Sequence, residues 1–135
     1  HRSRIMQTLL AIGAGGALGA IARYLLVSRI GHWLGPEGLG GIPVGILSAN
    51  VLGSLVMGLV ATYFALAWQP PEALRVLVTT GLLGAFTTFS TFALEASVFL
   101  ERAALGQAAI YIGGSVGLSL LGLFAGIWLM RWVLA

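Results

Sequence analysis

Hydroxyl and aromatic side chains mix within one apolar stretch of the chain, in the segment Thr87-Thr88-Phe89-Ser90-Thr91-Phe92. Phe86, Phe89 and Phe92 recur at every third residue. An aromatic ring has a positive edge and a negative face, so rings turned edge-on can replace part of the water around a small anion. A stripe of Phe is also common in helix packing and lipid contact, and the residues alone leave both interpretations open.

The same stretch carries Gly81 and Gly84 just before the hydroxyl cluster, which suggests a broken helix. Non-helical backbone is tolerated in a membrane only where it is buried in protein or lines a watery cavity, and its freed carbonyls need partners. A hard cation such as Na⁺ is one such partner, because carbonyl oxygens can replace its hydration shell. A continuous helix whose hydroxyls bond back onto its own carbonyls is the alternative.

Two further polar features lie in other apolar stretches. Asn50 is the only Asn of the chain, and a buried amide needs a hydrogen-bond partner. It either bonds to a neighbouring helix or donates its NH₂ group to an anion. Tyr111, Ser115 and Ser119 are spaced four residues apart, which places three hydroxyls on one helical stripe. That stripe predicts either a track of anion donors or a helix-packing surface.

Arg23 and Glu95 are ionisable residues in or near the ends of apolar stretches, and charges at such positions are candidates for function. They can also pair structurally or reach the membrane surface. Glu95 favours a rival hypothesis, a proton-coupled transporter. No enzyme class fits, because the chain has no Asp, no Cys and no phosphate-binding Gly-Lys-Ser/Thr motif.

The composition indicates that these residues lie in membrane-spanning helices. Of 135 residues, 59% are hydrophobic and 8% are charged, and the mean hydropathy is +1.00. Soluble domains carry about 25% charged residues, so the chain is predicted to be an all-α integral membrane protein. A single domain over residues 1–135 is expected, with spans at about 5–30, 42–68, 73–100 and 103–134. The net charge of +3 is too small and too scattered for binding of nucleic acid.

The charges and small residues also bear on assembly. Four spans place both termini on one side. One face then has Arg2, Arg4, Arg75 and Arg131, and the other has Arg29 and Arg102, with Arg23 deeper in the first span, so the bias that sets orientation is weak. Insertion in both orientations is therefore open, beside a single topology. Four helices enclose little space, and pairs such as Gly113/Gly117 are typical of helix contacts. We therefore expect a homo-oligomer, with a ligand path between copies of the chain.

The segment from Gly81 to Phe92, followed by Glu95, resembles the Fluc (CrcB-type) family of fluoride channels. The similarity covers the whole chain, including residues 15–24, Asn50-Val51-Leu52-Gly53 and the Tyr111, Ser115 and Ser119 stripe. Ala85 stands where many relatives have a second Gly.

This resemblance implies an antiparallel, dual-topology homodimer of four-helix subunits, with the third helix broken near its middle and two fluoride pathways at the subunit interface. It implies a structural Na⁺ on the two-fold axis, held by the backbone carbonyls of Gly84 and Thr87. The implied fluoride pathway contains one amide, two rings and a set of hydroxyls: Asn50, Phe89, Phe92, Ser90, Thr91, Tyr111, Ser115 and Ser119. Arg23 and Glu95 match a family arginine and glutamate, as vestibule or structural charges.

The function implied is a passive, electrogenic, fluoride-selective channel in the inner (plasma) membrane, inserted in both orientations, which exports fluoride from the cytoplasm and relieves its toxicity. The main alternative is a proton-coupled antiporter of the small multidrug-resistance type that uses Glu95. A subunit that transports nothing is a third hypothesis.

Overall fold

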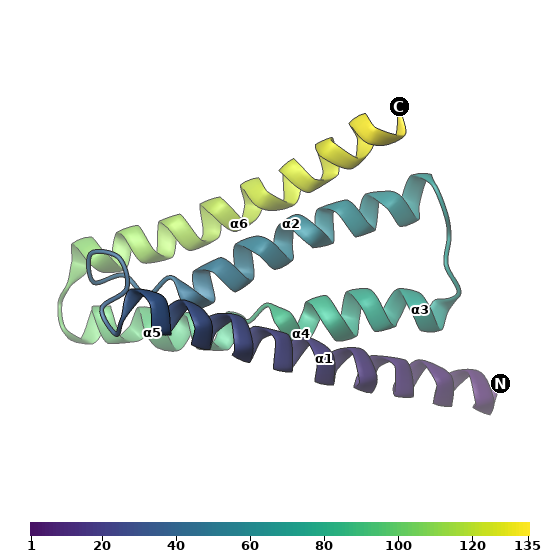
Figure 1. Cartoon of the computed structure of the whole chain (residues 1–135), viewed down its shortest axis with the longest axis horizontal. Helices are drawn as coiled ribbons and strands as arrows, with labels where there is room; N and C mark the ends of the chain where they lie inside the picture. Colours follow the sequence, from purple (N-terminus) through teal and green to yellow (C-terminus); the bar gives the residue numbers. More distant parts are fainter.

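The computed structural model describes residues 1–135, and it consists of helices joined by short connections. Four helical spans are long and apolar enough to cross a membrane: α1 (Arg2–Leu34), α2 (Gly45–Leu66), the composite span Glu72–Glu101 and α6 (Leu105–Leu134). Both termini lie at the same end of the molecule (Figure 1). The predicted four-span architecture is confirmed, although α1 extends beyond residues 5–30 at both ends and α2 begins only after Pro43.

The third span is broken, as the resemblance implied. It comprises α3 (Glu72–Val76), the π-helical segment η1 (Leu77–Leu83), α4 (Gly84–Phe86) and α5 (Phe89–Glu101). Between α4 and α5 the backbone is extended, with φ −89° and ψ 155° at Thr87 and φ −151° and ψ 125° at Thr88. The alternative of a continuous helix is wrong, although the Thr87 hydroxyl does bond back to the Leu83 carbonyl at 3.0 Å.

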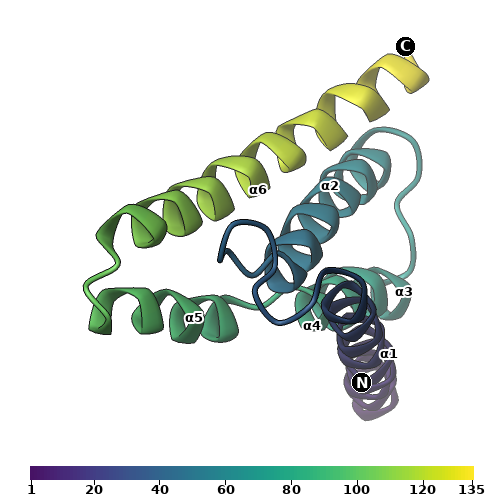
Figure 2. The same ribbon diagram turned by 60° about the vertical axis from the view of Figure 1, so that its left-hand side comes forward.

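Glycines set the closest helix contacts. α1 packs against η1 and α4, where a Cβ on Gly15 or Gly19 would overlap the carbonyl oxygens of Leu77 or Leu82. α2 packs along α6, and there Gly58 and Gly126 leave the same kind of space. The molecule is therefore two helix pairs, α1 with the first half of the third span and α2 with α6, which the views of Figures 1 and 2 separate.

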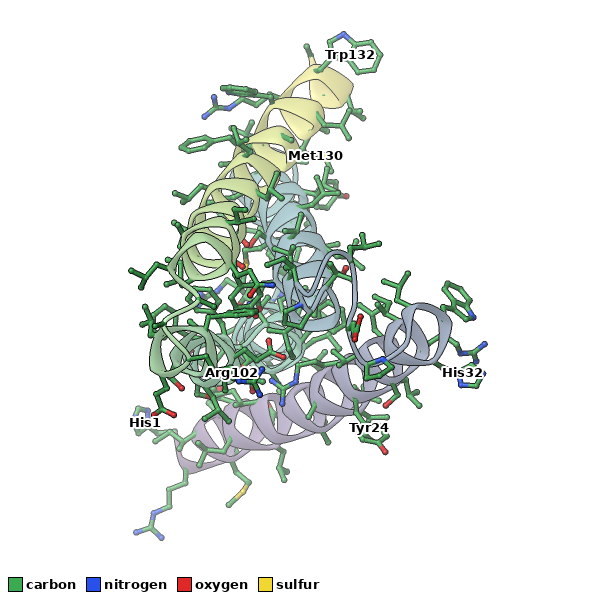
Figure 3. All side chains as sticks on the ribbon, turned by 90° about the vertical axis from the view of Figure 1, so that its left-hand side faces the viewer. His1, Tyr24, His32, Arg102, Met130 and Trp132 are labelled. Carbon is green, nitrogen blue, oxygen red and sulfur yellow. The ribbon has the colours of Figure 1, made fainter.

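The small core lies where α5 meets α2 and α6, and Tyr111 is its most deeply buried large side chain. The ring of Tyr111 contacts those of Phe92 and Phe99, with centroids 5.4 and 5.8 Å apart. Only 17 of 135 residues are buried, so most apolar side chains face outward, as Trp132 and Tyr24 do in Figure 3. Such faces suit lipid or a second copy of the chain.

The turn between α5 and α6 carries one strained residue. Ala103 has φ 55°, a left-handed conformation that costs a non-glycine residue about 1 kcal/mol or more. Replacing Ala103 by Gly is expected to raise the unfolding temperature in detergent by a few degrees. Ala104, at φ −82°, provides the matched control. Ala104→Gly should lower the unfolding temperature, and a drop for both variants would contradict this assignment of strain.

Candidate functional site

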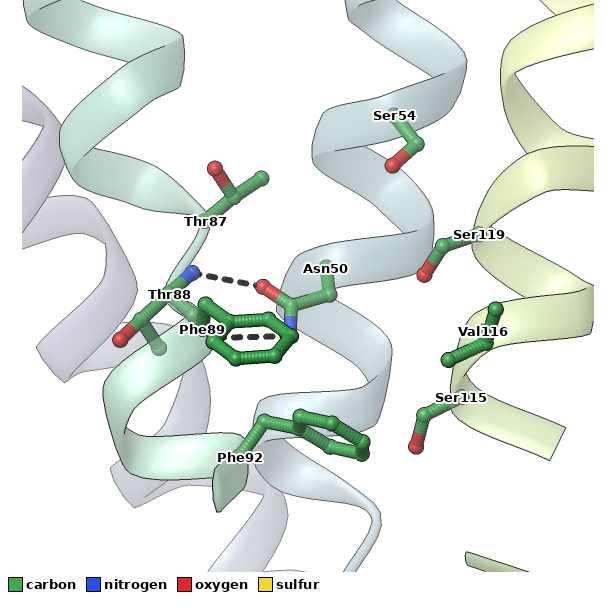
Figure 4. Close-up of a pocket in the computed structure, with 9 residues that line it drawn as sticks. All are labelled: Asn50, Ser54, Thr87, Thr88, Phe89, Phe92, Ser115, Val116 and Ser119. Atoms are coloured by element: carbon green, nitrogen blue, oxygen red, sulfur yellow. Dashed lines mark hydrogen bonds between the residues drawn. The ribbon is translucent and has the colours of Figure 1, made fainter. Parts of the chain in front are cut away.

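A cavity of about 260 Å³ opens beside the break in the third span, between α2 and α6 (Figure 4). The break supplies Thr87 and Thr88, and α5 supplies Phe89 and Phe92. The remaining lining residues come from α2 and α6: Asn50, Ser54, Ser115, Val116 and Ser119. Every lining side chain is neutral, so an ion in this cavity would meet only dipoles and rings.

The Asn50 side chain bonds to the backbone of the break. Its Oδ1 accepts the backbone N–H of Thr88 at 2.7 Å, and its Nδ2 donates to the Thr88 carbonyl at 3.0 Å. The amide thus pairs with Thr88 as a neighbouring strand would, which satisfies backbone groups that no helix serves. A carboxamide has two N–H donors. One is used on Thr88, and the other remains for a ligand of the cavity.

The cavity hydroxyls differ in their bonding: those of Thr87 and Thr88 are bonded within the chain, whereas that of Ser115 is not. The Ser115 side chain is 4% exposed, and its buried Oγ has no hydrogen-bond partner. A buried hydroxyl without a partner costs free energy, and Ser115 is the one buried side chain of the cavity lining whose polar atom the chain leaves unsatisfied. Ser119 lies one turn further along α6, on the same side (Figure 4).

The sequence analysis missed Ser54 as a lining residue. It lies on α2, one turn beyond Asn50, and its hydroxyl faces the cavity across from Ser119 (Figure 4). The i, i+4 spacing from Asn50 was the signal that could have identified it. Thr87 and Thr88 also line the cavity. The sequence analysis named both only as members of the hydroxyl cluster, and Thr87 also for its backbone carbonyl.

The two phenyl rings differ in burial. Phe92 is 8% exposed and packs on Tyr111, whereas Phe89 is 77% exposed. Their centroids are 5.5 Å apart and the ring planes are tilted by 55°, so the pair presents ring edges as well as faces. Phe89 forms one margin of the cavity and has nothing of this chain over it.

Other predicted residues lie beside the cavity and do not line it. Ser90 and Thr91 bond to the Thr88 hydroxyl, at 3.3 and 3.4 Å, and Thr88 also accepts the Thr91 N–H as the cap of α5. Tyr111 is buried behind Phe92, and its hydroxyl donates to the Glu95 carboxylate. Glu95 itself lines a second cavity, of about 180 Å³, formed by the end of α1 and the α1–α2 connection.

Gly84 and Thr87, the two residues implied for a metal ion, lie at the end of α4 and in the break, and Thr87 also lines the cavity, whereas the arginine reaches the break from α1. The Arg23 guanidinium donates to the Ala85 carbonyl at 3.1 Å. The carbonyls of Leu83 and Thr88 accept hydrogen bonds from Thr87 and Asn50, whereas no hydrogen bond outside the helices reaches the carbonyl of Gly84 or of Thr87.

The arrangement is suited to moving an ion and not to breaking a bond. Nothing in the first cavity is a nucleophile with an adjacent base, and the one carboxylate nearby is bonded to Tyr111 outside it. Neutral donors in a row can replace the water of an anion without holding it as a fixed positive charge would. The fold and the cavity together define a multi-pass membrane protein with a cavity lined by neutral polar and aromatic side chains at a helix break.

Comparison with known proteins identifies the family. Residues 10–127 match the family described as "CrcB-like protein, Camphor Resistance (CrcB)", and the chain belongs to this family. It is a family of ion channels and not of enzymes.

Relatives named fluoride-specific ion channel FluC align over almost the full chain. The protein of Phenylobacterium zucineum is 49% identical over 131 residues, which are 96% of this chain and 100% of the relative. That of Rhodospirillum centenum is 46% identical over 130 residues, 96% and 100% of the two chains. That of Rhizobium meliloti is 41% identical over 126 residues, 93% and 98%.

Proposed function

We propose that this protein is a passive, electrogenic channel that exports fluoride from the cytoplasm across the inner membrane. The observation that carries the proposal is the Ser115 hydroxyl, buried without a partner in a cavity lined only by neutral groups. The relatives that align over almost the full chain are named fluoride-specific channels, and these names indicate fluoride as the ion. Fluoride is small and strongly hydrated, so it requires several hydrogen-bond donors at close range to leave water.

The residues of the cavity divide this task. The free N–H of Asn50 and the hydroxyls of Ser54, Ser115 and Ser119 donate to the anion in succession. The edges of Phe89 and Phe92 supply weak positive potential where no hydroxyl reaches. Each contact is weak, so fluoride can leave each position for the next. Ser90, Thr91 and Tyr111 support this row, the first two by bonding to the Thr88 hydroxyl that caps α5 and the third by backing Phe92.

The working unit in this proposal is an antiparallel homodimer with two pathways. Phe89 is 77% exposed although it borders a polar cavity, and a second copy of the chain is the partner that would cover it. The open glycines of α6 also leave room for a close helix contact, because a Cβ on Gly113 or Gly117 would meet nothing within 4 Å. The weak bias of Arg between the two faces permits both orientations in one membrane.

A structural Na⁺ fits the chemistry of the break. Backbone carbonyls are hard oxygen ligands, and those of Gly84 and Thr87 are without partners from other elements. These two residues would hold the ion through their backbone carbonyls. If so, replacing Na⁺ with N-methylglucamine at constant ionic strength should lower the unfolding temperature of the purified protein, with Li⁺ and K⁺ restoring it only partly. An unfolding temperature independent of the cation would remove Na⁺ from the account.

The proposal is tested by fluoride release from liposomes that contain the purified protein, followed with a fluoride electrode. The liposomes hold KF or KCl, and a K⁺ ionophore is added to relieve the charge that builds up. Fluoride loss should begin only with the ionophore and without a proton gradient, and chloride should stay inside. Release driven by a proton gradient, and abolished by Glu95→Gln, would replace the channel with the antiporter. Absence of any flux from folded protein would favour the subunit that transports nothing.

Ser115→Ala separates a ligand-binding hydroxyl from a structural one. Removing a buried, unpartnered hydroxyl should leave the unfolding temperature unchanged or slightly higher. The same change should reduce the fluoride flux by about tenfold, because one donor to the anion is lost. Ser97→Ala is the control, since the Ser97 hydroxyl is bonded to the Leu94 carbonyl at 2.7 Å and lies outside the cavity. Normal flux in Ser115→Ala would exclude Ser115 from the pathway.

A further inference from the structure

The short helix α4 ends in an unusual way. A helix end leaves carbonyls that the next turn would normally serve, and here the next residues, Thr87 and Thr88, are extended. The Ala85 carbonyl is served instead by Arg23 of α1, whose Nη1 donates to it at 3.1 Å. This contact joins residues 62 positions apart in the sequence. It is also the only hydrogen bond that the Arg23 side chain makes.

The position of Arg23 on α1 is fixed by the turns before it. Gly15 and Gly19 bring the α1 backbone against Leu77 and Leu82, so closely that neither position has space for a Cβ. Arg23 follows Gly19 by one turn, on the same face of the helix. Its half-buried guanidinium therefore reaches α4 from a rigid base, and the positive charge meets the negative end of the helix.

The contact has a direct consequence for the break. The Ala85 carbonyl accepts a hydrogen bond from Arg23. The Leu83 carbonyl accepts one from Thr87, and the Thr88 carbonyl accepts one from Asn50. The carbonyls of Gly84 and Thr87 have no such partner. The break is thus held from two sides, by Arg23 on the α1 side and by Asn50 on the cavity side. Arg23 does not line the cavity.

We propose that Arg23 is a positioning residue that caps the end of α4. The cap holds the backbone of the break in the conformation that places Thr88 against Asn50 and shapes the cavity. The resemblance left this arginine as either a vestibule charge, which would attract anions, or a structural charge. The two roles differ in what they require: capping requires a donor at the Ala85 carbonyl, whereas attraction requires only a positive charge near the entrance. The effect on flux rests on the proposed channel function, but the effect on the backbone does not.

The test compares Arg23→Leu and Arg23→Lys with Arg29→Leu, which removes an exposed arginine from the same helix. Hydrogen exchange of the purified protein in lipid nanodiscs is measured over residues 84–91. The Thr87 and Thr88 amides are bonded to the Leu83 carbonyl and to Asn50 Oδ1, and they report the integrity of the break. Fluoride flux is measured in liposomes against fluoride concentration, at low and high ionic strength.

If Arg23 is a cap, Arg23→Leu should speed exchange at the break by about tenfold and lower the flux at saturating fluoride, with little change in the half-saturating concentration. Arg23→Lys should restore protection in part, and Arg29→Leu should match the original protein. Unchanged exchange in Arg23→Leu, with a higher half-saturating concentration that high salt abolishes, would overturn the proposal in favour of attraction.

Two further outcomes are also decisive. If Arg23→Leu does not fold, Arg23→Met decides, because Met keeps a long unbranched side chain and has no N–H donor: faster exchange supports the cap, and exchange equal to that of the original protein overturns it. If even the original protein conducts no fluoride, the proposed function fails. The exchange comparison still decides the role of Arg23.

Discussion

Asn50→Asp is expected to reduce fluoride flux by at least about a hundredfold. The carboxylate keeps the bond from the Thr88 N–H but cannot donate to the Thr88 carbonyl, and an unserved buried carbonyl costs about 1–3 kcal/mol. It also places a negative charge in the anion pathway. Two unit charges about 4 Å apart repel by about 4 kcal/mol at an effective dielectric constant of 20. Since about 1.4 kcal/mol corresponds to tenfold in rate, the two effects together exceed a hundredfold.

Gln107→Glu is the matched control for that measurement. It makes the same change from amide to carboxylate on α6, where the Gln107 amide only reaches the Gly40 carbonyl at 3.5 Å, away from the cavity. Flux and ion selectivity should be those of the original protein. If Asn50→Asp conducts fluoride normally, the cavity beside the break is not the pathway.

The second large effect is expected from a single methyl group on α1. In Gly19→Ala the new Cβ would overlap the Leu82 carbonyl and contact the Ala85 side chain, so α1 must move away from the third span. Overpacking of this kind costs about 1–3 kcal/mol, and a backbone neighbour cannot rotate aside. The unfolding temperature in detergent should fall by roughly 5–10 °C. Because Arg23 follows on the same helix, flux should fall as well.

Gly16→Ala tests whether that loss comes from the helix contact. Gly16 is in the same turn of α1, but a Cβ there would meet nothing within 4 Å. Alanine is also favoured over glycine inside a helix by about 0.5–1 kcal/mol. Gly16→Ala should therefore be as stable as the original protein or more so. Equal destabilisation by both changes would indicate a general sensitivity of α1 instead of close packing at Gly19.

The four spans were predictable because lipid leaves few choices to the backbone. Apolar runs of about 20 residues must form helices there, and the charged and Pro-containing breaks between them mark the ends. Composition alone did not predict the break in the third span, because Thr hydroxyls can also bond to the carbonyls of the preceding turn in a continuous helix. Thr79 and Thr87 make such bonds here. The resemblance supplied what composition could not decide.

The site was only partly predictable for a different reason. The sequence indicated that Asn50 needs a partner, but it could not show that the partner is the backbone of Thr88, 38 residues away. That contact depends on how α2 crosses the break, which is a property of tertiary packing. Ser54 was missed because Ser is common in membrane helices and usually serves packing. Only its place beside Asn50 in the folded chain distinguishes it.

The Glu95 hypothesis shows the same limit. A lone carboxylate in an apolar span indicates function, and nothing in the sequence placed it relative to the hydroxyl track. In the structure, Glu95 is bonded to Tyr111 and faces the second cavity, so it is separated from the first cavity by the aromatic core. Its carboxylate is thus absent from the lining of the cavity that holds Asn50 and Ser115.

In the proposed function, copies of this chain form a pathway selective for fluoride without any other protein. The most direct test is the reversal potential of the current in a planar bilayer, with fluoride on one side and chloride on the other. We expect a current through the original protein that reverses close to the equilibrium potential of fluoride, with no dependence on a pH gradient. A reversal potential that follows chloride or protons, or the absence of current from folded protein, would contradict it.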